Sequence, residues 1–266
     1  MLQVLAGREV LGPELGLRPH LPTMEPKDCA LTHPATEELR SVGALGDDDT
    51  VDDVIAEWLA VLSRREVALL FHRYEHDSGI GERHLLARFA QWWVSLKRCA
   101  SAVHVSGIGA ATTEEAAASL VGSYVEREYG ALNAAEFRPL TLSADRLIEA
   151  VRRTGSSEDA LSGLNLDCEQ AAILTLAADS SRSTQLSVVA LQSGAELAPQ
   201  RSQIGPDGIT IIDTPRGRVL SEHRSEDGTG WLVLCPGSHQ SIARAVVRMM
   251  RQLPARETWY SYRKVI

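Results

Sequence analysis

Apolar and polar positions near the end of the chain alternate in a way that predicts a hairpin. Two apolar runs with β-branched residues, Ile209–Ile212 and Arg218–Ser221, flank a short turn segment. Asp213, Thr214, Pro215 and Gly217 supply residues that favour tight turns, so the two runs are expected to pair as antiparallel strands. Another apolar run, Trp231–Leu234, predicts a third strand.

An amphipathic helix is predicted to follow these strands over Ser238–Leu253. Ser238 stands where a helix cap is needed, because its hydroxyl can accept a hydrogen bond from a free backbone N–H of the first turn. The apolar positions then share one helical face; they are Ile242, Val246, Met249, Met250 and Leu253.

The same order of elements, a helix, several strands and a helix, is predicted in each half of the chain. The first half offers helices at Val51–Leu62 and Thr113–Glu128 and strands at Val67–Arg73, Leu85–Trp92, Val94–Lys97 and Ala102–Ser106. The second half adds helices at Ser143–Arg153 and Leu166–Ala178 and a strand at Gln185–Leu191, with a polar connection over Gln192–Asp207. Consecutive strands joined by short turns pair antiparallel, so an α+β fold with a central antiparallel sheet is expected.

The composition of the chain argues against several classes of function. The 266 residues carry a net charge of −8, which disfavours binding to nucleic acid. The longest apolar run, Ala171–Ala178, is too short to insert into a membrane, and no export signal is evident, so a cytoplasmic location is expected. The four cysteines stand far apart in the sequence, which is not the spacing of a zinc site.

Candidate catalytic and metal-binding groups are few. His72, Glu75, His76 and His84 lack a metal-binding spacing, and hydrogen-bonded or solvated loop histidines explain them better. The glycine pairs at Gly79–Gly81 and Gly107–Gly109 lack the rest of a phosphate-binding motif, and turns account for them. The sequence therefore predicts no catalytic residue, cofactor or metal. The alternative is a small hydrolase or metal-dependent enzyme assembled from distant residues such as His72, His76 and His104.

Aromatic residues are expected to serve packing. The core is the favoured place for Trp58, the pair Trp92–Trp93 and Trp231. The terminal group around Trp259 is expected to pack against the edge of the core, with a contact surface as the alternative.

Three segments carry a resemblance to a known family. They are "IIDTPRGRVL" from Ile209, "PGSHQSIARAV" from Pro236, and Leu253-Pro254 followed by Trp259; "LGLRPHLP" at Leu15–Pro22 adds to them. The chain resembles the EspG family, cytosolic chaperones of type VII (ESX) secretion, and within it the paralogue of the third ESX system. The resemblance implies a single domain over residues 1–266, with halves 1–135 and 136–266 in a quasi-two-fold arrangement and helical bundles flanking the sheet.

The resemblance also implies a function. The protein would bind PE–PPE heterodimers at the tip of the PPE helical bundle, keep them soluble and direct them to their ESX system. The family's recognition surface corresponds here to the loop between the first two long strands and to the C-terminal helical region, whose final helix is Ser238–Leu253. That loop comprises Glu75, His76, Asp77, Ser78, Gly79, Ile80, Gly81, Glu82, Arg83 and His84. A homodimer, and a purely structural homo-oligomer, remain open.

Overall fold

The computed structural model describes residues 1–8, 11–17, 26–74, 81–99, 102–154, 157–193 and 202–263. Its helical segments are α1 (Leu2–Leu5), η1 (Pro13–Leu15), α2 (Pro26–Leu31), α3 (Ala35–Ser41), α4 (Asp53–Arg64), α5 (Glu114–Tyr129), α6 (Ala144–Thr154), α7 (Ser157–Ser162), α8 (Cys168–Ala178), α9 (His239–Arg251) and η2 (Arg256–Thr258). Its strands are β1 (Val67–Tyr74), β2 (Glu82–Phe89), β3 (Trp92–Cys99), β4 (Ala102–Ala110), β5 (Leu140–Ser143), β6 (Thr184–Ser193), β7 (Ser202–Thr214), β8 (Gly217–Glu226) and β9 (Thr229–Pro236).

All strands join one nine-stranded sheet in the order β4-β3-β2-β1-β6-β7-β8-β9-β5, and every pair is antiparallel. The predicted α+β class and antiparallel sheet are confirmed. The order is mirrored about the central β1–β6 pair, with three further strands of a meander on each side before β5 is added at one margin. A rotation that superposes the two halves stays a prediction.

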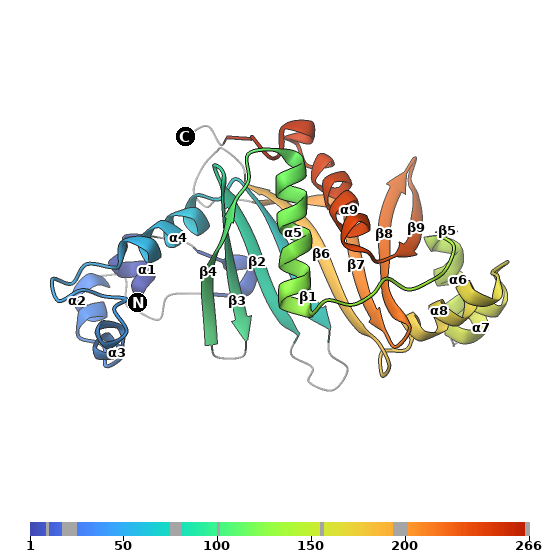
Figure 1. Cartoon of the computed structure of the whole chain (residues 1–266), viewed down its shortest axis with the longest axis horizontal. Helices are drawn as coiled ribbons and strands as arrows, with labels where there is room; N and C mark the ends of the chain where they lie inside the picture. Colours follow the sequence, from blue (N-terminus) through green and yellow to red (C-terminus); the bar gives the residue numbers. More distant parts are fainter. Residues whose placement is uncertain are drawn as a thin grey trace.

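One face of the sheet, called here the α5–α9 face, is covered by those two long helices (Figure 1). Val67, Leu69 and Phe71 of β1 alternate with residues of the other face and pack with α5, α9 and strands β6 to β8 in the largest apolar cluster. Every predicted apolar position of the last helix is buried in this cluster. The spacing of apolar residues along that helix therefore correctly predicts which of its faces packs on the sheet.

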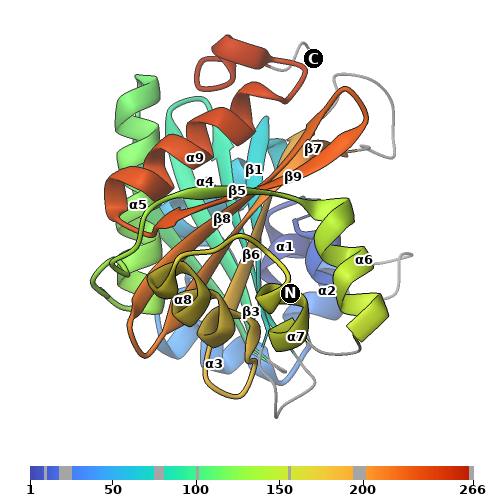
Figure 2. The ribbon, with the colours of Figure 1, turned by 90° about the vertical axis from the view of Figure 1, so that its right-hand side faces the viewer.

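The opposite face is covered at its two ends by different helices. Near β1–β3, Leu59 and Leu62 of α4 pack with Leu85 and Leu96 of the sheet. Near β7–β9, α7 and α8 pack on Ile212, Val219 and Leu234. Figure 1 shows α1–α4 at one end of the elongated molecule and α6–α8 at the other, and Figure 2 shows α6 across the sheet from α5 and α9. Two helical groups therefore flank the sheet.

Two of the predicted helices begin at residues whose side chains cap the first turn. Ser238 is the N-cap of α9, and its Oγ accepts a hydrogen bond from the Ser241 backbone N–H at 3.1 Å. Asp167 and Gln170 form a capping box at the start of α8. The predicted turn is also confirmed, because Thr214 pairs with Gly217 across a two-residue connection between β7 and β8.

Some boundaries and burial states differ from the sequence-based expectations. The connection expected at Gln192–Asp207 is strand at both ends, since β6 reaches Ser193 and β7 begins at Ser202; residues 194–201 lie outside the described part. Strand β4 continues through the glycines expected in a turn to Ala110. Trp92 was expected in the core but is 52% exposed, because strand alternation directs its neighbour Trp93 into the core instead.

The C-terminal segment packs on the sheet as predicted. Trp259 is fully buried, and its Nε1–H donates to Glu114 of α5 at 2.7 Å. The buried Arg88 of β2 donates to the carbonyls of Tyr260 and Tyr262 and pairs with the buried Glu66 at 3.0 Å. The end of the described chain is thus held by hydrogen bonds to its backbone as well as by apolar packing.

Candidate partner-binding surface

The predicted loop Glu75–His84 is shorter in the structure than in the sequence-based interpretation. Residues 75–80 lie outside the described part, and Gly81 leads directly into β2, which begins at Glu82 rather than Leu85. The register pairs Arg73 with Glu82, His72 with Arg83 and Phe71 with His84. Glu82, Arg83 and His84 are therefore strand residues at the base of the loop.

Strand alternation sends these three side chains to different faces. Arg83 is exposed and lies beside His72 on the face opposite α5 and α9. His84 is fully buried and faces α5, so it supports the hairpin from within. Of the described residues of the predicted loop, Arg83 is thus best placed to meet a partner.

A partly buried polar cluster joins the base of the hairpin to β3 and α5; it comprises Glu82, His84, Ser95, Lys97, Cys99, Tyr124 and Tyr129. His84 Nδ1 lies 3.0 Å from the hydroxyls of both Tyr124 and Tyr129. The Tyr124 hydroxyl is also 2.9 Å from Ser95 Oγ. The Glu82 carboxylate accepts from Lys97 at 2.6 Å and from Cys99 at 3.0 Å. These bonds fix the outgoing side of the hairpin to the rigid body of the fold.

The cluster also sets the charge states of its members. Burial lowers the pKa of His84 below its ordinary value, and the positive charge of Lys97 adds to this effect. Burial acts to raise the pKa of Glu82, but hydrogen bonds from Cys99 and Lys97 outweigh it and lower that pKa to about 2. At neutral pH the cluster therefore holds a neutral imidazole beside an ionised carboxylate.

An uncovered area lies between the two helical groups on the opposite face. We call it the open sheet face; it comprises His72 and Tyr74 of β1, Ser187 and Val189 of β6, and Thr210 of β7. The register places His72 beside Ser187 and Ser187 beside Thr210. Tyr74 is 54% exposed, while Ser187 and His72 are also exposed. The sequence carries a signal for this area, because Gln185, Ser187 and Val189 alternate with the buried Leu186, Val188 and Ala190.

The helical group α6–α8 bounds this area at one end. Its helix α6 buries Ala144 and Ala150 but leaves Ile148 48% and Val151 37% exposed. These two residues are three positions apart, so they share one helical face. Apolar side chains exposed in this way are available to a protein partner.

The alternative enzyme site is not assembled by the fold. His72 and His104 lie on β1 and β4, which are separated by two strands, and alternation sends their side chains to opposite faces. His76 lies outside the described residues. Among the residues that the structure places, no group of three or more metal-binding side chains comes together.

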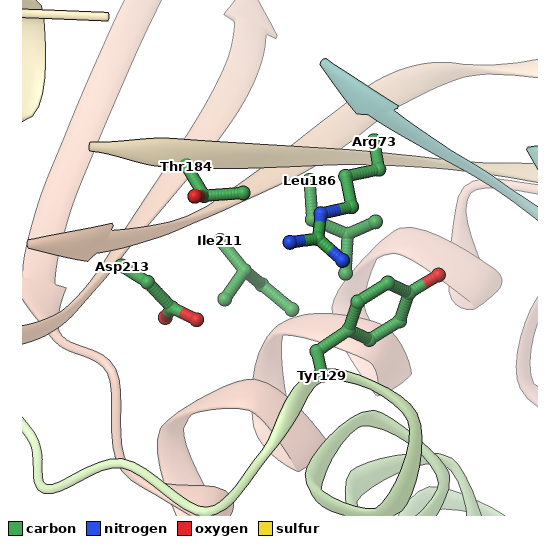
Figure 3. Close-up of a pocket in the computed structure, with 6 residues that line it drawn as sticks. All are labelled: Arg73, Tyr129, Thr184, Leu186, Ile211 and Asp213. Atoms are coloured by element: carbon green, nitrogen blue, oxygen red, sulfur yellow. The ribbon is translucent and has the colours of Figure 1, made fainter. Parts of the chain in front are cut away.

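A small cavity lies on the α5–α9 face beside the base of the hairpin (Figure 3). It is lined by Arg73, Tyr129, Thr184, Leu186, Ile211 and Asp213 and holds about 50 Å³. Sites for small-molecule ligands are usually several hundred Å³ in volume. Asp213 is also engaged by Arg218, whose guanidinium bonds both carboxylate oxygens at 2.6 and 2.9 Å. The cavity therefore does not offer a substrate pocket.

The exposed residues Tyr74 and Arg83 at the base of the hairpin, together with the open sheet face, suit contact with another protein rather than chemistry on a small molecule. The model of the EspG family matches residues 1–248, and the chain belongs to the EspG family. This is a family of non-enzymatic chaperones, so the enzyme alternative is wrong. Among the described residues, no helix is long and apolar enough to cross a membrane.

Individual relatives refine this result. The chain is 40% identical to the ESX-2 secretion-associated protein EspG2 of Mycobacterium tuberculosis, over 100% of this chain and 96% of the relative. It is 24% identical to the ESX-5 secretion-associated protein EspG5 of Mycobacterium marinum, over 100% and 94%. The expected proximity to the third ESX system is wrong, because the relative at 40% identity belongs to ESX-2.

A solved structure shares the fold over the whole chain. It is the M. tuberculosis type VII secretion chaperone EspG5 in complex with the PE25–PPE41 dimer. The TM-score is 0.73 at 20% identity, and the match covers 100% of this chain and 95% of the other. That relative was thus solved with a PE–PPE dimer bound.

Proposed function

We propose that this chain is a cytosolic chaperone that binds a PE–PPE heterodimer at the tip of the PPE helical bundle. It keeps the pair soluble and directs it to its type VII secretion system. The observation that carries the proposal is that its fold matches, along the whole chain, a family member solved with a PE–PPE dimer. The 40% identity to EspG2 further supports a cognate system of the ESX-2 type.

The physical basis is the coverage of an aggregation-prone surface. A long helical substrate with an apolar tip self-associates when that tip is exposed. A protein that binds the tip favours the soluble form by mass action. Because the substrate must later be released, the affinity should be useful without being extreme.

The proposed surface combines the base of the β1–β2 hairpin, the open sheet face and the exposed side of α6. The loop between β1 and β2 is added to them. Arg83 stands at the base of the hairpin, beside the polar open sheet face around His72. Tyr74 supplies an exposed aromatic group, and Ile148 and Val151 of α6 supply exposed apolar groups at the other end. Aromatic and apolar anchors within a polar rim are the usual composition of a protein interface. The loop segment 75–80 completes the surface in this proposal.

The register between β1 and β2 allows a test of whether the loop of this hairpin contributes to partner binding. Because Arg73 pairs with Glu82, Tyr74 stands opposite Gly81 in the continued ladder. Replacing residues 75–80 by Asn-Gly therefore makes a two-residue turn without shifting the strands. We expect the variant to keep its melting temperature and to bind the PE–PPE pair at least tenfold more weakly, about 1.4 kcal/mol.

A matched control uses the other two-residue connection. Pro215-Arg216 is exposed between β7 and β8, and its replacement by Asn-Gly also leaves the register unchanged. The chain would be co-expressed with PE–PPE pairs of its own genome and tested by size-exclusion chromatography and calorimetry. A folded loop variant that binds as tightly as the parent would move recognition away from the hairpin. The double change Ile148→Glu and Val151→Glu would then test α6.

A further inference from the structure

Three neighbouring strands carry basic side chains next to one another on the face opposite α5 and α9. His72 of β1 lies directly across from Arg83 of β2, and Arg83 lies directly across from Arg98 of β3. Directly opposed residues of antiparallel strands point to the same side of the sheet, with Cβ atoms about 5 Å apart. All three residues are exposed. We call this set the basic row; it borders the open sheet face, with which it shares His72.

The two arginines of the basic row are not neutralised by the part of the chain that the structure describes. Among the described residues, no carboxylate forms an ion pair with Arg83 or Arg98. Arg98 donates a hydrogen bond from Nη1 to the carbonyl of Leu15 at 2.7 Å, which orients its guanidinium without reducing its charge. Like charges directly opposite each other destabilise a sheet. The basic row is therefore electrostatically unfavourable in the free chain.

The other face of the same strands compensates its positive charges. Arg73 and Lys97 adjoin His72 and Arg98 in the sequence, but strand alternation places them on the α5–α9 face. Both pair with the carboxylate of Glu82, at 3.9 and 2.6 Å. The arginines of the basic row lack such a partner within the described chain, so an anionic group from outside would complement them.

We propose that the basic row binds carboxylates of the partner, namely acidic side chains at the tip of the PPE helical bundle. This inference rests on the proposed function, because it assigns a chemistry to part of the same surface. A guanidinium holds a carboxylate through two parallel N–H···O bonds, and the opposed pair Arg83 and Arg98 supplies two such groups. The hydroxyls of Ser187 and Thr210 continue the row beyond His72 onto the open sheet face, where they add hydrogen-bonding groups.

The basic row gives the surface selectivity. The chain as a whole carries a net charge of −8, so an acidic partner is repelled by most of its surface. The basic row offers that partner one favourable point of approach, which fixes its orientation and speeds association. A tip without acidic residues is disfavoured, because the two arginines would lose water without gaining a counter-ion. The basic row therefore selects among PE–PPE pairs, while Tyr74 and the exposed side of α6 supply apolar contact.

The strand register supplies a variant that separates binding from folding. In Arg83→Glu the new carboxylate lies between His72 and Arg98, so an attractive cross-strand pair replaces a repulsive one. The free chain should therefore melt no lower than the parent, while binding of the PE–PPE pair should weaken about tenfold or more. Arg83→Lys keeps the charge and should lose less affinity. The control Arg244→Glu makes the same change of charge at an exposed arginine of α9, on the other side of the sheet.

The assay is calorimetry with the PE–PPE pair that co-elutes with the parent chain, at about 0.05 M and about 0.5 M NaCl. The affinity of the parent should fall about tenfold as the salt concentration rises, because salt screens the contact between arginine and carboxylate. Arg83→Glu should lose most of this salt dependence, and Arg244→Glu should keep it. Changing the acidic residues of the PPE tip to lysine, one at a time, should restore the affinity of Arg83→Glu at one or more positions.

The possible failures separate this proposal from the proposed function. If no PE–PPE pair of the genome binds the parent, the proposed function fails and the assignment of the basic row fails with it. If a pair binds the parent and Arg83→Glu equally tightly, if salt leaves the affinity of the parent unchanged, or if no lysine restores binding, the function stands and the acidic contact is overturned. A lower melting temperature of Arg83→Glu without partner also overturns it, because the chain itself would then compensate Arg83.

Discussion

The buried ion pair between Arg88 and Glu66 offers a test of how the C-terminal segment is held. Both side chains are almost completely buried, at 0% and 1% exposure. The Arg88 guanidinium also donates to the carbonyls of Ala90, at 2.7 Å, and of Tyr260 and Tyr262. Burial lowers the pKa of Arg88 to about 10 even though the charge of Glu66 acts in the other direction. Desolvation therefore exceeds the attraction between the two groups.

That balance predicts an asymmetric response to substitution. Arg88→Met keeps a long side chain but leaves the Glu66 carboxylate buried with less compensation, which typically costs about 3–5 kcal/mol. For 266 residues the unfolding entropy is about 0.56 kcal/mol/K, so the melting temperature should fall by about 5–9 °C. In Arg88→Met/Glu66→Gln the buried charge is removed, and the neutral amide can still accept from the Ala90 N–H, so part of the loss should be recovered.

The assay is urea and thermal unfolding of the parent, both variants and Arg244→Met, an exposed arginine on α9. The control should stay within about 0.5 kcal/mol of the parent. A single variant within about 1 kcal/mol of the parent would refute the reasoning. A double variant less stable than Arg88→Met would refute it too, because the penalty would then not come from an uncompensated carboxylate.

Five other outcomes are expected. Ser238→Ala should lower stability by about 0.5–2 kcal/mol in urea unfolding, because a helix cap is lost, and should leave partner affinity unchanged. Gly217→Ala should cost about 1–3 kcal/mol by the same measurement, since φ is 116° there and a Cβ would lie 2.8 Å from Ala135 N. Melting scans should show stability fully present above about pH 6.5 and falling as the pH drops, because unfolding lets His84 regain its ordinary proton affinity. A further loss should begin below about pH 4.5 and continue toward 2 as Glu82 is protonated, and Glu82→Gln should remove that step. Substrate binding measured by calorimetry should survive an excess of chelator; loss of binding on removal of an ion would contradict the expected independence from metals.

Much of the fold could be predicted from local sequence because its signals act over short distances. The helix after Ser238 carries a cap and a regular apolar stripe, and both are confirmed. The hairpin around Pro215-Arg216 follows from turn residues between two β-branched runs. These features depend on neighbours within a few positions, so the sequence alone determines them.

Other features depended on contacts between distant segments. The start of β2 at Glu82 follows from its pairing with β1 and from the bonds of Glu82 to Lys97 and Cys99, and a polar sequence gave no local sign of this. His84 looked like a loop histidine, but its burial depends on Tyr124 and Tyr129 of α5.

The candidate partner-binding surface also has parts that the sequence predicts and parts that only the tertiary structure determines. The sequence determined that a polar hairpin lies between two strands, and its resemblance to a family indicated that the hairpin meets a partner. The tertiary structure alone decided that His72 lies on the open sheet face beside Ser187, a residue more than a hundred positions away, and that Arg83 stands next to this face. It also decided that β4 lies at a margin, because strand order is set by how two distant meanders join through β1 and β6. Such joins are fixed by the packing of whole layers, which no local pattern records.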